Sequence, residues 1–123
     1  METRIIVCGG TDFIDYEFFR ASLEKLFEDY EDIRIVSGHA KGADTFAEKY
    51  AADNQIPIRV FPAEWEKYGR AAGPIRNRAM LDYAKEETPV VAAFWDGRSP
   101  GTGNMLKQAM AVGVECHIFN YEN

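Results

Sequence analysis

The sequence predicts an α/β protein: a three-layer, Rossmann-like sandwich in which a five-stranded parallel sheet carries helices on both faces. Strand-like and helix-like segments alternate along the whole chain, beginning and ending on a strand. The first strand-like segment, Ile5–Cys8, is a continuous apolar run, which is typical of a strand covered on both faces. Right-handed crossovers between covered strands imply an open parallel sheet, and we expect the strand order 3-2-1-4-5 without a residue pattern that requires it.

The first half of the chain contains three strands and two helices. Strands are predicted over Ile5–Cys8, Ile33–Ser37 and Pro57–Phe61, and proline is tolerated at the start of the third. Asp15 is a suitable N-cap for the first helix. Apolar residues recur at helical spacing on the first helix (Phe19, Leu23, Leu26, Phe27, Tyr30) and on the second (Ala43, Phe46, Ala47, Tyr50, Ala51).

The second half opens with an unusually long connection, Pro62–Ala72. It exceeds the usual 2–6 residues, which suggests a lid or a partner surface. Its Trp65 and Tyr68 could stack on a base, cap the core or fill a dimer interface. The remaining elements are a helix from Pro74 to about Glu86, a strand over Pro89–Phe94, a helix over Gly101–Val112 ended by Gly113, and a strand over Glu115–Phe119.

Length and composition indicate one ordinary globular domain, expected to span residues 1–123. Hydrophobic residues make up 46% of the chain and charged residues 28%, which argues against disorder. No apolar run approaches a membrane span, and the N-terminus leads straight into a strand, so we expect no secretory signal. Cys8 and Cys116 are expected to be reduced and buried, as in a cytoplasmic protein.

The glycines predict where a ligand binds. Nine of the ten lie in or beside connections that lead from a strand into a helix. All such connections meet at the carboxyl edge of a parallel sheet, where ligands bind. Glycine lets a ligand approach the backbone closely, and the N–H groups at helix N-termini favour an anion. The sequence therefore predicts a phosphate- or nucleotide-type site at this edge, while the opposite edge is an acidic, solvated face.

The charge distribution narrows the kind of ligand. A net charge of −6 disfavours a protein that mainly coats nucleic acid, because Lys and Arg supply that affinity. Between Lys67 and Leu81, however, four basic residues occur and no acid. Arg76 begins a helix, where the dipole disfavours a cation, so we expect it to pair with Asp96 or with a ligand phosphate.

The candidate site residues come from four loops. Lys41 can reach a phosphate, the Gly101–Gly103 N–H groups could cradle one, and Asp96 could accept hydrogen bonds from ribose hydroxyls. Phe13 could lie under the ligand or cover the core. The full set of expected ligand-binding residues is Gly9, Gly10, Thr11, Phe13, Ser37, Gly38, Lys41, Gly42, Asp44, Arg76, Asn77, Asp96, Ser99, Gly101, Thr102 and Gly103.

Some chemistries are not supported by these loops. The first loop is not G-x-G-x-x-G and the second lacks the Gly-Lys-Ser/Thr ending of a P-loop. No cluster of Cys or His residues lies near His39 in the sequence, which argues against a transition-metal site. We interpret His39 as an exposed loop residue in preference to a general base. We therefore expect no metal ion and no resident cofactor.

Five motifs cover nearly the whole chain: Gly9-Gly10-x-x-Phe13, Ser37-Gly38-x-Ala40-Lys41-Gly42-Ala43-Asp44, Phe61-Pro62-Ala63-x-Trp65, Ala72-Gly73-x-x-Arg76-Asn77-x-x-Met80 and Phe94-x-x-Gly97-x-Ser99-x-Gly101-Thr102. Together they resemble the SLOG superfamily, Rossmannoid domains related to DprA/Smf and to the LOG phosphoribohydrolases, and most closely its YspA-like branch. The resemblance implies that the domain binds a nucleotide-derived phosphorylated ligand, such as a nucleoside monophosphate or an ADP-ribose-like molecule, as a sensor or processing module.

The resemblance leaves two alternatives open. A LOG-type N-glycosidic hydrolase would use Arg76, but Met105 stands where that family has its catalytic Glu, so Asp44 or Asp96 would have to replace it. The other alternative is a single-stranded DNA binder similar to DprA. The net charge of −6 argues against it, because binding to phosphates depends on Lys and Arg. The expected partner is a small nucleotide-type molecule, with no membrane and no nucleic acid. Tyr16 and Phe18 could serve a homo-oligomer interface.

Overall fold

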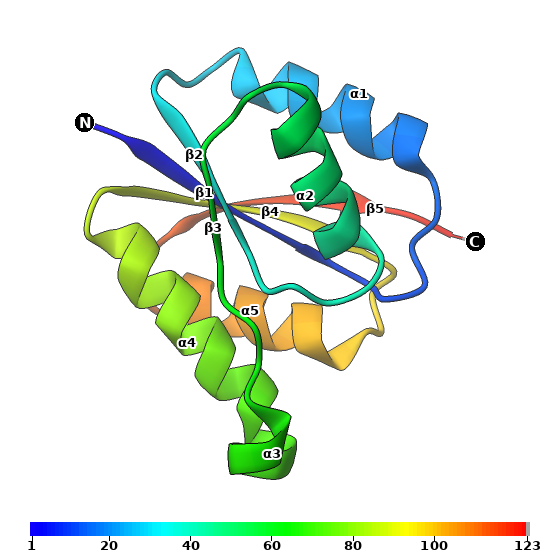
Figure 1. The fold of residues 1–123 in the computed structure, drawn as a ribbon, viewed down its shortest axis with the longest axis vertical. Coiled ribbons are helices and arrows are strands. Elements are labelled where there is room, and N and C mark those ends of the chain that lie inside the picture. Colours follow the sequence, from blue (N-terminus) through cyan, green and yellow to red (C-terminus); the bar gives the residue numbers. More distant parts are fainter. Residues whose placement is uncertain (123) are drawn as a thin grey trace.

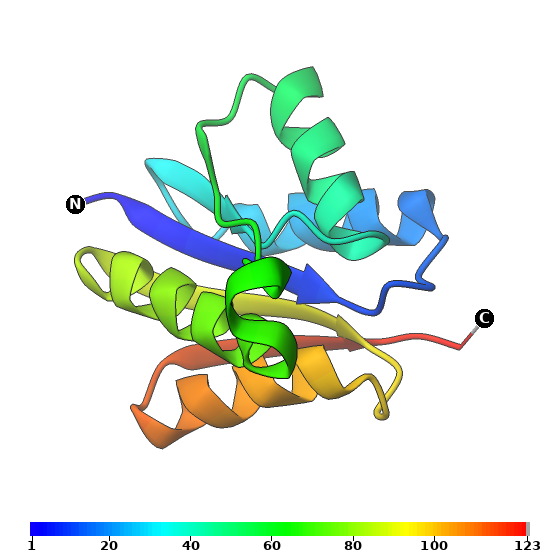
Figure 2. The same ribbon diagram turned by 60° about the horizontal axis from the view of Figure 1, so that its bottom comes forward.

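The architecture is the three-layer sandwich that the alternation of elements predicts. A computed structural model describes residues 1–122, and its five strands form one parallel sheet in the order β3-β2-β1-β4-β5, which confirms the predicted order. Helices α1 and α2 cover one face of the sheet, and α4 and α5 cover the other (Figure 1, Figure 2). The strands are β1 (Thr3–Gly9), β2 (Ile33–Ser37), β3 (Ile58–Val60), β4 (Thr88–Trp95) and β5 (Glu115–Asn120). The helices are α1 (Tyr16–Phe27), α2 (Ala43–Asp53), α3 (Trp65–Tyr68), α4 (Ala72–Lys85) and α5 (Pro100–Ala111).

The core explains why the central strands are apolar throughout. Successive side chains of a strand point to opposite faces of the sheet. Ile5 and Val7 of β1 therefore pack in the cluster beneath α1 and α2, whereas Ile6 and Cys8 pack beneath α4 and α5. All four are less than 9% exposed. Burial of both faces of β1 fixes the sheet between two helical layers and leaves its carboxyl edge to the loops.

Several predicted boundaries change in the structure. Asp15 does cap α1, where its Oδ1 accepts a hydrogen bond of 3.0 Å from the Phe18 N–H, but α1 ends at Phe27 and Tyr30 lies beyond it. Helix α4 begins at Ala72, two residues before the expected Pro74. None of the helices within residues 1–122 is long and apolar enough to cross a membrane.

The connection after β3 is not an irregular loop. It contains helix α3 and a single 3₁₀ turn, Gly69–Ala71, that leads directly into α4. This helix has only four residues, too few to show a helical period in the sequence, so no helix is predicted there. Trp65 remains 59% exposed and Tyr68 38%, so neither is a core residue. Figure 1 shows α3 at the bottom of the view, projecting beyond the end of α4.

The two cysteines differ in burial. Both are free, as expected, and Cys8 is buried in the middle of the sheet. Cys116 is only partly buried, so the expectation that both are buried is wrong for this residue. The reason is its place on β5, which lies at the edge of the sheet and is flanked by a strand on one side.

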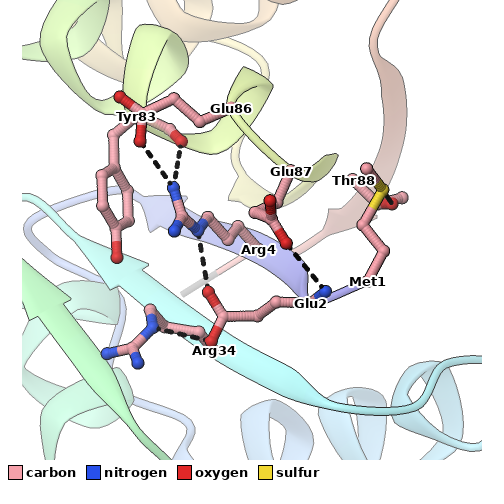
Figure 3. A network of polar contacts seen from close by, with 8 residues as sticks. All are labelled: Met1, Glu2, Arg4, Arg34, Tyr83, Glu86, Glu87 and Thr88. Atoms are coloured by element: carbon pink, nitrogen blue, oxygen red, sulfur yellow. Dashed lines mark hydrogen bonds and ion pairs between the residues drawn. The ribbon is translucent and has the colours of Figure 1, made fainter.

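The amino edge of the sheet is held by a network of charged side chains (Figure 3). Glu2 accepts hydrogen bonds from Arg4 at 2.8 Å and from Arg34 at 3.0 Å, which joins the starts of β1 and β2. Arg4 also donates to the Tyr83 carbonyl oxygen at 2.6 Å, which attaches α4. The hydrogen bond from Arg4 lowers the pKa of Glu2. The acidic face expected at this edge is thus partly neutralised by arginines and serves the fold.

Candidate functional site

The loops at the carboxyl edge of the sheet enclose a pocket of about 280 Å³. It lies between the end of β1, the turn that begins α2, the start of α4 and the start of α5. Segments far apart in the sequence therefore come together at the edge where the glycines predicted a ligand. The lining residues are Cys8, Gly9, Gly10, Thr11, Ala40, Asp44, Arg76, Asn77, Met80, Ser99, Pro100, Gly101 and Thr102.

A backbone-to-backbone contact joins two of these loops. Gly42 adopts φ 72° and ψ −122°, a conformation that side chains strongly disfavour. A Cβ at this position would overlap the Gly10 carbonyl oxygen and lie 3.0 Å from the Thr11 Cα. Gly42 is therefore a site residue in an indirect sense: it allows the loops after β1 and β2 to approach each other, but it does not line the pocket.

The N-terminus of α5 presents unused backbone donors to the pocket. Ser99 is the N-cap, but its side chain does not cap the helix, and Pro100 has no N–H. The Ser99 N–H donates to Asp96, and the Gly103 N–H already donates to the Ser99 carbonyl oxygen at 3.1 Å. The N–H groups of Gly101 and Thr102 remain at the helix start. Gly103 is thus not one of the available donors, which corrects the expected Gly101–Gly103 cradle.

Asp96 shapes the loop before α5 instead of facing the pocket. Its Oδ1 accepts hydrogen bonds from the N–H groups of Ser99, at 2.7 Å, and Arg98, at 2.8 Å. These backbone donors lower the pKa of the carboxyl group. The side chain lines a separate hollow near Tyr121, so its expected contact with ribose hydroxyls has no support in the geometry.

Arg76 and Asn77 connect three of the site's segments. Arg76 donates through Nη1 to the Gly38 carbonyl oxygen and through Nε to Asn77 Oδ1 at 3.0 Å. Asn77 in turn donates to the Gly101 carbonyl oxygen at 3.2 Å and to Asn104 Oδ1 at 3.1 Å. The Arg76 guanidinium thus contacts neutral acceptors and not the Asp96 carboxylate that was one expected partner. Because neither acceptor carries a charge, the positive charge of Arg76 can still attract an anionic ligand in the pocket that this residue lines.

Asp44 is the buried carboxylate of the pocket. It is 6% exposed, and its Oδ2 accepts a hydrogen bond of 3.0 Å from the Ala40 N–H. Its Oδ1 has no hydrogen-bond partner among residues 1–122. Burial raises the pKa of Asp44 to about 6, although the Ala40 N–H and the charge of Arg76 act in the opposite direction. A buried, unsatisfied carboxylate oxygen is costly and is typical of a position where a ligand supplies the missing donor.

Three expected site residues lie away from the pocket. Phe13 is 1% exposed and stacks against Phe94 with ring centroids 5.4 Å apart, so it covers the core. Lys41 lines a different hollow, beside the exposed His39. Ser37 is fully buried and its Oγ accepts a hydrogen bond of 3.3 Å from the His39 N–H, which shapes the loop. The sequence predicts all three as ligand contacts, and the structure places none of them in the lining of this pocket.

The pocket also contains residues that the sequence analysis did not single out. Cys8, Ala40, Met80 and Pro100 line it. Cys8 ends an apolar strand at the carboxyl edge, which is a signal that could have identified it. Burial raises the pKa of its thiol, so it lines the pocket as an inert apolar group. Met105 belongs to α5, is fully buried in the core between this helix and the sheet, and does not line the pocket.

Comparison with known proteins identifies a family for this chain and a solved structure with the same fold. The family model described as "YspA, cpYpsA-related SLOG family" matches residues 3–68. The Gene 61 protein of Mycobacterium phage D29 is 30% identical over 117 residues, covering 90% of this chain and 91% of that protein. The structure of DNA processing protein A (DprA) from Streptococcus pneumoniae superposes with a TM-score of 0.74 at 18% identity, covering 98% of this chain. The chain spans about half, 51%, of that DprA chain, and the likeness shows a shared fold.

Proposed function

The chain belongs to the YspA, cpYpsA-related SLOG family, and we propose that it binds a phosphorylated, nucleotide-derived ligand in the carboxyl-edge pocket. One observation carries this proposal: the uncapped N-terminus of α5 and the Arg76 guanidinium line the same cavity. Both attract an anion, and they come from different helices, so a phosphate between them would be held from two sides.

The phosphate is expected at the start of α5. The N–H groups of Gly101 and Thr102 are the donors there, and the positive end of the helix dipole adds to them. A Cβ at Gly101 would meet no atom within 4 Å, so the space in front of this turn is open to a ligand. Arg76 supplies a charge-assisted hydrogen bond, which contributes about 1.5–3 kcal/mol.

The size of the cavity favours the smaller of the two ligand classes. At about 280 Å³ it lies just below the range of roughly 300–1,000 Å³ that is usual for ligand pockets. A nucleoside monophosphate matches this volume better than an ADP-ribose-like molecule, whose second half would extend beyond the enclosed part. We therefore take a nucleoside monophosphate as the first ligand to test.

The two alternative functions receive less support. In a LOG-type hydrolase the catalytic Glu would occupy position 105, and here that position holds a methionine in the core. The likeness to DprA is one of fold, and a net charge of −6 does not favour binding of a nucleic-acid backbone. Release of free base during incubation with nucleotides would detect the first activity, and retention of single-stranded DNA at moderate salt the second.

The proposal is tested by calorimetric titration of AMP, ADP-ribose and NAD into the wild type and two variants. Arg76→Ala removes the cation that lines the pocket, and we expect it to weaken AMP binding by about 10- to 100-fold. Lys41→Ala is the matched control, because it removes the same charge from a neighbouring loop but faces a different hollow. It should change the dissociation constant by less than about threefold.

A third variant tests the α5 turn itself. Gly101→Val places an isopropyl group in front of the helix start, in space that is open in the structure. It should abolish AMP binding while the melting temperature changes little. Absence of measurable binding to the wild type for all three nucleotides, or equal losses from Arg76→Ala and Lys41→Ala, would contradict the proposal.

A further inference from the structure

We propose that Asp44 selects the ligand: its Oδ1 accepts a hydrogen bond from a sugar hydroxyl of the bound molecule, and the contact requires the ionised carboxylate. This inference rests on the proposed function and deepens it, because it adds a second recognition element to the same pocket. The ligand class becomes a phosphorylated sugar or nucleoside that keeps its ribose hydroxyls.

The geometry of Asp44 leaves one carboxylate oxygen without a hydrogen-bond partner among residues 1–122. The side chain sits in the first turn of α2, and the Ala40 N–H holds its Oδ2 at 3.0 Å. Oδ1 is buried, lacks a partner within the described part of the chain and belongs to a side chain that lines the cavity. A polar atom in this state loses its hydration without gaining a hydrogen bond, at a cost that a donor from the ligand would remove.

The charged and titratable groups around Asp44 come from three elements. Arg76 of α4 favours its ionised form, Glu48 of α2 opposes it, and the thiol of Cys8 on β1 faces it from the sheet. The backbone N–H groups of Ala40 and Gly38 also favour ionisation, yet burial outweighs them and the pKa rises to about 6. A hydroxyl that donates to Oδ1 would stabilise the ionised form, so ligand binding is coupled to release of a proton near this pH.

The same carboxylate orients the ligand. A phosphate close to Asp44 would be repelled, whereas the start of α5 attracts it. The phosphate and the sugar are therefore directed to different ends of one pocket. A site that is built to hydrogen-bond a hydroxyl discriminates strongly against an analogue that lacks it, because the buried acceptor is then left unpaired. We expect a ribonucleotide to bind and its dideoxy analogue to be rejected.

The experiment measures dissociation constants of AMP and of 2′,3′-dideoxy-AMP for the wild type and Asp44→Asn. The asparagine has the same shape and keeps an oxygen for the Ala40 N–H. The wild type should prefer AMP by at least about tenfold, and Asp44→Asn should reduce this preference to less than about threefold. Glu48→Gln is the matched control, since it removes a carboxylate one turn further along α2 that contacts His39, and it should leave the preference unchanged.

The proton coupling is measured by repeating the titrations between about pH 5 and about pH 8. The phosphate of AMP also titrates in this range, but it does so equally for both proteins. The ratio of the wild-type affinity to the Asp44→Asn affinity should therefore fall by about tenfold from the upper to the lower pH. A carbon-13 NMR titration of the wild-type Asp44 carboxyl gives a second readout, because bound AMP should lower its pKa.

The outcomes separate this inference from the proposed function. If AMP binds but the dideoxy analogue binds equally well, or if the affinity ratio does not change with pH, the role of Asp44 is overturned and phosphate binding stands. If neither nucleotide binds the wild type, the proposed function fails and this inference fails with it. A preference for AMP that Asp44→Asn removes and Glu48→Gln retains supports the inference.

Discussion

Replacing Gly42 with alanine tests whether the loops after β1 and β2 are held together by a close backbone contact. Two costs arise at this position. Alanine is strained at φ 72° and ψ −122°, by about 1–3 kcal/mol. Its Cβ would also overlap the Gly10 carbonyl oxygen, and relief requires a backbone shift that costs about 1–3 kcal/mol. The reduced entropy of the unfolded chain offsets about 0.4–1 kcal/mol of this. We expect a net destabilisation of about 2–4 kcal/mol.

Gly113→Ala provides the matched control. Gly113 has a similar φ of 73°, but a Cβ there would meet no atom within 4 Å, so only the conformational strain applies. We expect a cost of about 1 kcal/mol. Urea unfolding of the two variants and the wild type gives the difference directly. Gly42→Ala should also weaken AMP binding, since the Gly10 loop must move. If both variants lose the same stability, the proposed contact between the two loops does not exist as described.

Three further predictions concern stability. The pKa of Asp44 is raised to about 6, so the folded protein binds a proton on this carboxyl more tightly than the unfolded chain does. The wild type should therefore lose about 2–2.5 kcal/mol relative to Asp44→Asn as the pH rises from about 4 to about 7, measured by urea unfolding, and a flat difference would contradict this. Phe13→Leu should lower the free energy of unfolding by about 1–2 kcal/mol because the ring lies in the core. It should change the affinity for AMP by less than about twofold, and a large loss of affinity would show that Phe13 contacts the ligand. Glu2→Gln should lower the free energy of unfolding by about 1 kcal/mol at neutral pH because it removes the carboxylate that pairs with Arg4. This difference should shrink as the pH falls through the lowered pKa of Glu2, because the wild-type carboxylate then becomes protonated. Glu17→Gln is the control in an exposed ion pair and should have no measurable effect in thermal unfolding.

The sequence was sufficient to predict the sheet and the edge at which the pocket lies. Continuous apolar runs such as Ile5–Cys8 identify covered strands, and chirality rules then reduce the topology to very few choices. The clustering of glycines in strand-to-helix turns predicted the converging loops, and a Cβ added at Gly42 would overlap the Gly10 carbonyl oxygen of the neighbouring loop.

The directions of individual loop side chains could not be predicted. Lys41 lies one residue from the tight turn at Gly42, and the backbone there directs it to a separate hollow. A carboxylate that follows a strand suits a ligand acceptor, and the sequence predicts this role for Asp96. In the structure, however, its Oδ1 accepts hydrogen bonds from the N–H groups of its own loop. Phe13 shows the same limit, since an aromatic residue after a glycine turn suits a core equally well. The direction of each of these side chains depends on which groups lie near it in the folded protein, and the spacing of residues along the chain does not contain that information.

The two chain ends leave the molecule on different sides (Figure 1). Met1 and Glu2 lie at the amino edge with the arginine network, remote from the pocket, whereas the Tyr121 hydroxyl donates to Asp12, one residue past the pocket-lining Thr11, at 2.7 Å. A tag, a surface linker or a fused module placed ahead of Met1 would therefore leave the ligand entrance open. The same addition after Tyr121 would emerge beside the entrance, so immobilisation through the amino end is the sounder arrangement for binding assays.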